Sequence, residues 1–158
     1  MKYFLDTEFA EKPCTIELIS LGIVAEDGRE WYAENLNFNP DNANDWVKEN
    51  VLAHLEGGWT EIPLVDFKDE ILSFIGTDTP EFWGYYADYD WVVFCWLFGT
   101  MIDLPKGWPM YCRDIKQLAD SLGNPQLPVQ YTKEHHALSD ALWNKRAYEF
   151  LTGVKNVQ

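Results

Sequence analysis

Three β-prone segments at the start of the chain constrain the fold more than any other feature. Residues 2–9 have a short, apolar and β-prone start, residues 15–25 are rich in apolar and β-branched side chains, and residues 30–36 form a third run. A Glu-Asp-Gly sequence joins the second run to the third, and an Asp-Gly pair in this position is typical of a β-hairpin. The sequence therefore predicts strands that include a hairpin in the first quarter of the protein.

Helical patterns dominate the rest of the chain. Residues 63–75 form the clearest one, because their apolar side chains recur at helical spacing before Gly76. Residues 91–98 are apolar on all sides, so periodicity does not separate a buried helix from a buried strand there, and we favour a helix. Other elements are expected as helices at 45–55, around Ile115 to Leu122 and at 137–151, and as strands at 81–86 and near Tyr111. This order predicts a mixed α/β fold around one sheet.

The composition is that of one soluble globular domain covering residues 1–158. The chain is 47% hydrophobic and 24% charged, and aromatic residues make up 16% of it, which argues against disorder. We expect no membrane span and no signal peptide, because no sufficiently long apolar run and no leader pattern are visible. Three cysteines without CxxC spacing indicate free thiols in a reducing compartment, and therefore the cytoplasm.

The net charge of −14 limits how this chain can bind nucleic acid. It carries 12 basic and 26 acidic residues, whereas proteins that grip a long duplex usually present a basic face. Two interpretations remain at this point. The chain is either a small enzyme that takes only the end of a strand, with metal ions supplying positive charge, or a protein that never touches nucleic acid, such as an acidic nucleic-acid mimic or a partner-binding domain.

Two pairs of carboxylates suggest a metal site. Asp6 and Glu8 alternate on the first predicted strand, so both point to one side, about 7 Å apart at Cα. Without a nearby cation, two such charges repel each other. Asp88 and Asp90 follow the predicted strand 81–86, at a junction where ligands of sheet proteins tend to collect. An Asp there could equally cap the next helix, and local arguments do not choose between the two.

A third group near the C-terminus contains a similar ambiguity. His136 and Asp140 are four residues apart and therefore lie on one helical face. His135 and Asp140 are five apart, so they can meet at one site only if His135 precedes the helix. Helical geometry taken alone favours His136.

The order and context of these motifs resemble the DnaQ-like (DEDDh) 3′-5′ exonucleases. Asp6-Thr7-Glu8 is similar to the first motif of that family, Tyr89-Asp90 to the end of the second, and the spacing from His135 to Asp140 to the third. The resemblance implies an RNase H-like fold, with a central mixed sheet of about five strands flanked by helices. It also selects Asp90 over Asp88 and His135 over His136.

Further segments narrow the resemblance to a small, single-domain branch that contains a mycobacterial 3′-5′ exoribonuclease. They are Asp6 to Phe9, residues 15–22 and residues 46–52, so that the resemblance covers essentially the whole chain. One departure stands out. Tyr86 occupies the place where many relatives have an Asn that supports the site.

The resemblance implies a complete site. Two Mg²⁺ ions, or Mn²⁺ as a substitute, would be held about 4 Å apart, with His135 as the base for the attacking water. The product would be a nucleoside 5′-monophosphate from the 3′ end of single-stranded or overhanging RNA, with single-stranded DNA as the alternative substrate. Phe9 would stack against the terminal base, Glu17 would contact the terminal ribose, and the protein would form a homodimer. The implied metal ligands are Asp6, Glu8, Asp90 and Asp140.

Overall fold

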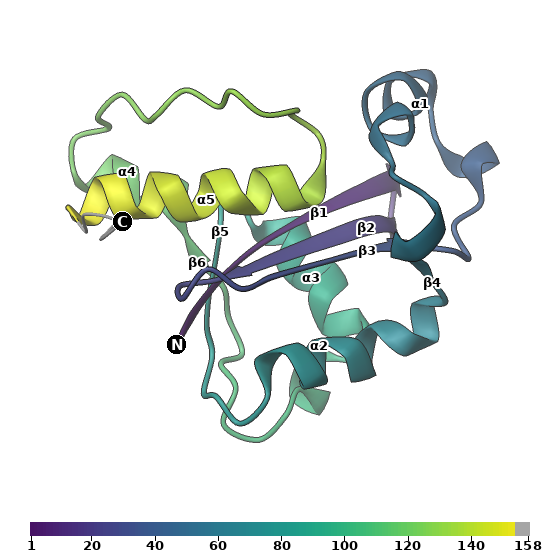
Figure 1. Ribbon diagram of the computed structural model, residues 1–158, viewed down its shortest axis with the longest axis horizontal. Coiled ribbons are helices and arrows are strands. Elements are labelled where there is room, and N and C mark those ends of the chain that lie inside the picture. The colour runs from purple at the N-terminus through teal and green to yellow at the C-terminus, as the bar shows by residue number, and fades with distance from the viewer. Residues whose placement is uncertain (154–158) are drawn as a thin grey trace.

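A computed structural model describes residues 1–153 of the chain; residues 154–158, which the predicted domain includes, lie outside the described residues. The described part forms one mixed sheet covered by helices (Figure 1). Its strands are β1 (Lys2–Lys12), β2 (Thr15–Ala25), β3 (Glu30–Asn35), β4 (Glu61–Ile62), β5 (Glu81–Gly84) and β6 (Arg113–Asp114). The predicted α/β class with a central mixed sheet is confirmed.

The sheet has the order β4-β3-β2-β1-β5-β6 in the described residues. β1, β2 and β3 form an antiparallel meander, so the predicted hairpin is confirmed, whereas β5 lies parallel to β1 and β6 parallel to β5. The prediction of about five strands lacks β4. This strand is only two residues long, and two residues show no periodicity. β1 also continues three residues beyond the predicted range, into a hairpin in which Cys14 has a φ of 64°.

Helices cover both faces of this sheet. In Figure 1, α5 (Ala137–Thr152) lies above the strands, while α2 (Phe67–Ile75) and α3 (Asp88–Trp96) lie below them. α4 (Ile115–Ser121) shares the face of α5, and α1 (Asp45–Asn50) lies beyond the far end of β1. The larger core cluster fills the space between the sheet and α2 and α3. A second cluster joins β1 and β5 to α5.

Several helix boundaries differ from the prediction. The expected helix 45–55 ends at Asn50 and is followed by a 3₁₀ turn, Leu52–His54, because the buried Val51 closes the helix and packs against the sheet. Similarly, a 3₁₀ turn, Leu64–Asp66, replaces the first turn of the expected helix 63–75. α3 begins three residues earlier than expected, at Asp88. No helix in residues 1–153 has the length and apolar character needed to cross a membrane.

Candidate active site

Asp6 and Glu8 lie on the part of β1 that extends beyond β5. β1 pairs with β5 only from Lys2 to Phe4, so the later residues of β1 have an open edge on that side. Alternation along the strand turns both carboxylates toward α5, and Glu8 is only 8% exposed. Asp6 and Glu8 therefore lie on the same face of β1, as predicted.

Thr7, between them, points to the other face and fixes Asp90. Its backbone N–H and its hydroxyl both donate hydrogen bonds to Asp90 Oδ1, at 2.7 and 2.6 Å. Asp90 lies in the first turn of α3 and is 7% exposed, whereas Asp88 is exposed to solvent. The structure thus brings Asp90 to β1 and leaves Asp88 outside. Neither caps the helix with its side chain, since the N-cap position is Ala87.

His135 precedes α5 and lies beside Asp140. Its backbone N–H donates to Asp140 Oδ2 at 2.9 Å, and its φ of 62° is in the left-handed region. The His135 ring contacts Trp46 of α1 edge to face, with 4.9 Å between the centroids. Because α5 begins only at Ala137, the residue spacing that argued against His135 does not apply.

His136 has a different environment. It is the N-cap of α5, where its Nδ1 accepts a hydrogen bond from Ser139 N–H at 3.4 Å. Its ring stacks on Tyr32, with centroids 4.6 Å apart, and its Nε2 lies 3.2 Å from a carboxylate oxygen of Glu56. The helical-face argument for His136 therefore does not apply in this structure, because His136 is a capping residue that points back toward its own helix.

Two close contacts dock α5 onto the sheet above Asp6. Gly22 is the register partner of Asp6 on β2, and a Cβ at this position would lie 2.5 Å from backbone atoms of Ala137 and Leu138. Only a glycine permits this approach of the first turn of α5. One helical turn beyond Asp140, the buried Asn144 donates to the Leu5 carbonyl at 2.9 Å. These contacts set the height of α5 over β1.

Three residues of this arrangement were not expected from the sequence: Thr7, Gln130 and Asn144. Gln130, from the segment before α5, donates a hydrogen bond to Asp140 Oδ1. A signal exists for Asn144, which lies four residues after Asp140 and hence on the same helical face. For Gln130 we find no signal, because its contact depends on the path of an irregular segment.

Burial and mutual repulsion raise the pKa values of the carboxylates in this cluster. Removal from water and the repulsion of Asp90, Glu8 and Asp140 raise the pKa of Asp6 well above its usual range. Burial first, and then the charge of Asp140, raises the pKa of Glu8 to about 9. Burial also raises the pKa of Asp90 to about 6, although the Thr7 hydrogen bonds oppose the shift. Crowded carboxylates of this kind do not all ionise at neutral pH unless positive charge joins them.

The donor atoms suit a hard divalent cation. Ligand atoms of Glu8, His135 and Asp140 all lie within 4.8 Å of one another, and Asp6 and Asp90 lie beside them. Carboxylate oxygens are the ligands preferred by Mg²⁺ and Mn²⁺. A pocket of about 480 Å³ opens next to Asp6, His135 and Asp140, with Tyr85 and Trp143 among its other lining residues. The residues present therefore fit the implied metal ions, and the pocket leaves room for a substrate.

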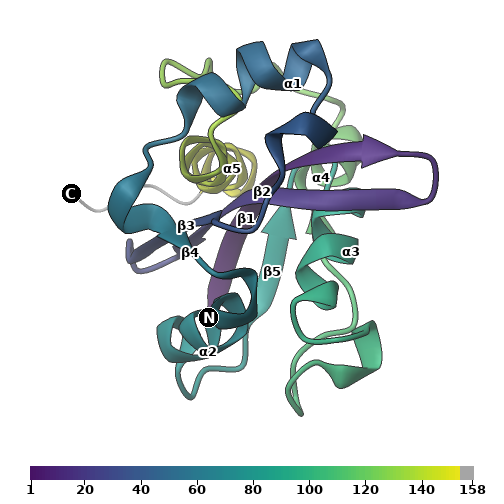
Figure 2. The same ribbon diagram turned by 90° about the vertical axis from the view of Figure 1, so that its right-hand side faces the viewer.

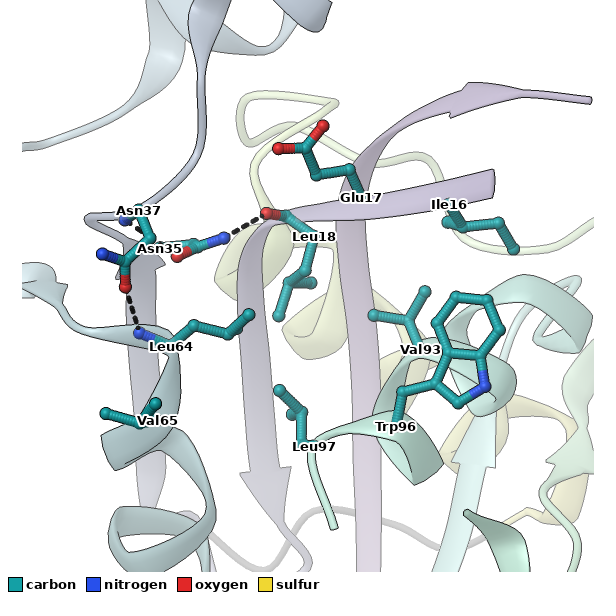
Figure 3. A pocket seen from close by; sticks show the side chains of 10 residues that line it. All are labelled: Ile16, Glu17, Leu18, Asn35, Asn37, Leu64, Val65, Val93, Trp96 and Leu97. Atoms are coloured by element: carbon teal, nitrogen blue, oxygen red, sulfur yellow. Dashed lines mark hydrogen bonds between the residues drawn. The ribbon is translucent and has the colours of Figure 1, made fainter. Parts of the chain in front are cut away.

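Phe9 and Glu17, the expected substrate contacts, have different surroundings. Phe9 follows Glu8 on β1, and its ring meets that of Tyr89 edge to face at 5.7 Å. Glu17 accepts a hydrogen bond from Asn42 Nδ2 at 2.7 Å, and it stands at the rim of a largely apolar pocket (Figure 3). That pocket does not include the four carboxylates.

Tyr86, the departure from the family pattern, has a φ of 56° and is 63% exposed. Asn adopts this left-handed region far more readily than a bulky residue does. This backbone conformation thus suits the Asn of many relatives. In this chain a Tyr adopts the same conformation, and the centroid of its ring lies 4.7 Å from that of Tyr85.

Comparisons with known proteins give consistent matches along the chain. A model of the 3′-5′ exoribonuclease Rv2179c-like domain matches residues 1–152. Two Mycobacterium tuberculosis proteins are each 40% identical to this chain over 159 residues. They are 3′-5′ exoribonuclease Rv2179c of strain H37Rv and 3′-5′ exoribonuclease MT2234.1 of strain CDC 1551. These alignments cover 98% of this chain and 95% of each relative.

Among solved structures, one chain from the structure of a yeast NOT1 MIF4G domain co-crystallised with CAF1 aligns with this chain, at 16% identity and a TM-score of 0.49, and the alignment covers 98% of this chain and 81% of that chain. The sequence matches span nearly all of the chain, including all three motifs. The chain belongs to the Rv2179c-like 3′-5′ exoribonuclease domain family.

Proposed function

We propose that this protein is a metal-dependent 3′-5′ exoribonuclease of the DEDDh type, which releases nucleoside 5′-monophosphates from the 3′ end of single-stranded or overhanging RNA. The observation that carries the proposal is the meeting of three separate segments at one place. β1 supplies Asp6 and Glu8, α3 supplies Asp90, and the start of α5 supplies His135 and Asp140. The activity named for the M. tuberculosis relatives supports the same reaction here.

Two Mg²⁺ ions fit the charge of this cluster. Four ionised carboxylates balance two divalent cations, and such a pair stabilises both the attacking and the leaving oxygen of an in-line displacement at phosphorus. The carboxylates with raised pKa values must lose their protons for this, so metal binding is expected to release protons. The ligands would be Asp6, Glu8, Asp90 and Asp140.

His135 has the surroundings of a positioned general base. The hydrogen bond from its backbone to Asp140 and the contact with Trp46 both restrict where the ring can lie. A neutral imidazole in this place would take a proton from the water that attacks the terminal phosphodiester. Thr7 and Gln130 would orient Asp90 and Asp140 by their hydrogen bonds.

The decisive experiment is digestion of a 5′-labelled RNA with a 3′ overhang, next to a DNA of the same sequence. We expect stepwise shortening of the RNA from its 3′ end with Mg²⁺ or Mn²⁺ and none with EDTA. Faster shortening of the DNA would favour an exodeoxyribonuclease. Stable RNA and DNA under all conditions would contradict the proposal and favour a non-catalytic acidic protein.

Paired variants test the site. Asp90→Asn should abolish shortening and Asp88→Asn should not, because only Asp90 lies in the cluster. Likewise, His135→Ala should lose most of the rate, whereas His136→Ala should lose little. Full activity of Asp90→Asn or of Asp140→Asn would refute the two-metal assignment.

A further inference from the structure

The outer face of α3 carries apolar side chains that the rest of the described chain covers only in part. Tyr89, Val92 and Trp96 recur along one side of the helix and are 48%, 37% and 51% exposed. The opposite side of the same helix, including Phe94, packs in the main core. A helix that is apolar all round is ordinarily buried on every side, so the exposed stripe indicates a surface that binds something.

This stripe forms one wall of a groove of about 530 Å³. The other wall is the hairpin of β1 and β2, which projects from the body of the sheet on the side of α3 in Figure 2. We call this the α3 groove; its lining residues from the hairpin run from Glu11 to Ile16. Lys12 is among them, and its Nζ contacts Asn42 Oδ1 at 3.3 Å but lies within 4.0 Å of no carboxylate in residues 1–153.

The α3 groove lies next to the candidate active site, because one of its lining residues, Tyr89, directly precedes Asp90. Tyr89, at its inner end, directly precedes Asp90 and contacts the ring of Phe9 at 5.7 Å, and Phe9 directly follows Glu8. Tyr89 thus joins the groove to the turn of α3 that carries Asp90, and a strand whose terminal phosphodiester lies at the carboxylates would enter the groove past this side chain.

We propose that the α3 groove binds the segment of single-stranded RNA on the 5′ side of the scissile bond. The bases stack on Tyr89 and Trp96, and Lys12 contacts a phosphate. Stacking suits a track of this kind because every base has a π face, so no sequence is selected. This inference rests on the proposed exonuclease function, since it assigns the substrate strand of that site.

The dimensions of the stripe set the length of RNA that it can hold. Seven residues separate Tyr89 from Trp96, so at about 1.5 Å per residue the stripe is about 10 Å long. Stacked nucleotides rise about 3.4 Å each, which places about three nucleotides along it. A second copy of the protein is a poorer occupant, because three partly exposed side chains supply only a small part of the roughly 800 Å² per partner of a stable interface.

The test is the dependence of kcat/KM on substrate length, measured with 5′-labelled RNAs of two to ten nucleotides. For the unmodified protein, kcat/KM should rise with length up to about four nucleotides and then level off. Trp96→Ala should lose about tenfold on the longer RNAs and nothing on the dinucleotide, whereas Trp96→Phe should retain most of the length effect. Trp59→Ala is the matched control, because Trp59 is fully exposed and lies outside the groove.

Equal loss of kcat/KM at all lengths in Trp96→Ala, or no loss at any length, would overturn the proposal. It would also be overturned if light scattering showed that the unmodified protein is a dimer and Trp96→Ala a monomer, since a second copy would then occupy the groove. If the unmodified protein cleaves no RNA, the proposed function fails separately. The groove is then judged by fluorescence anisotropy of a labelled uridine decamer with Ca²⁺, in which Trp96→Ala must bind about tenfold more weakly than Trp59→Ala.

Discussion

Gly22→Ala should disturb the site without unfolding the protein. The added Cβ would lie 2.5 Å from the backbone carbon and oxygen of Ala137, about 1 Å inside a normal contact distance of roughly 3.5 Å. Forcing an extra methyl into a tight site of this kind typically costs about 1–3 kcal/mol. The smaller conformational freedom of alanine in the unfolded chain offsets about 0.4–1 kcal/mol of that cost. We therefore expect a net loss of about 1–2 kcal/mol in the free energy of unfolding.

The effect of Gly22→Ala on kcat should be much larger than the loss in the free energy of unfolding implies. The obstructing atoms belong to the backbone of α5, so the helix must move by about the 1 Å of the overlap, carrying His135 and Asp140 away from Glu8 on β1. A misplacement of that size can cost about 100-fold in rate. Urea unfolding followed by tryptophan fluorescence gives the first quantity, and kcat on a labelled RNA gives the second.

Glu30→Ala serves as the control for Gly22→Ala, because Glu30 is an exposed residue on the neighbouring strand, where a substitution should change stability by less than about 0.5 kcal/mol. A Gly22→Ala protein with the urea midpoint and the kcat of the unmodified protein would refute the steric argument. Lost stability with an unchanged kcat would show that the first turn of α5 does not position the site.

Four further perturbations test the cluster and its surroundings. Thr7→Val should cost about 1–2 kcal/mol in urea unfolding and lower kcat, because it removes the hydroxyl bond to Asp90 but keeps the backbone one. In EDTA, the melting temperature should fall as the pH rises from about 5 to 9, because the raised pKa of Glu8, about 9, makes the folded state bind more protons than the unfolded one. Asp6→Asn should therefore raise that melting temperature, and a lower value would contradict the repulsion argument. His136→Ala should lower it, since a lost N-cap costs about 1 kcal/mol, while kcat stays nearly unchanged.

The sequence alone predicts most of the secondary structure, because periodicity and turn residues are local. The Asp-Gly turn and its flanking runs predict the hairpin of β2 and β3, and apolar spacing predicts α2 and α4. Boundaries shift where tertiary packing competes with propensity, as at Val51, which ends α1 by packing against the sheet. A strand as short as β4 exists only because β3 lies beside it.

The choice of site residues shows the same division. The sequence places acidic motifs in a recognisable order, and the resemblance to an exonuclease family selects Asp90 and His135 from it. Local geometry taken alone does not choose between Asp88 and Asp90, and it favours His136, which the structure places at the N-cap of α5 in contact with Tyr32 and Glu56. Asp90 belongs to the cluster because Thr7 of β1 bonds it from α3, and His135 does so because α5 starts only after it. Such contacts join residues far apart in the chain, and therefore only the tertiary structure decides which carboxylates share one site.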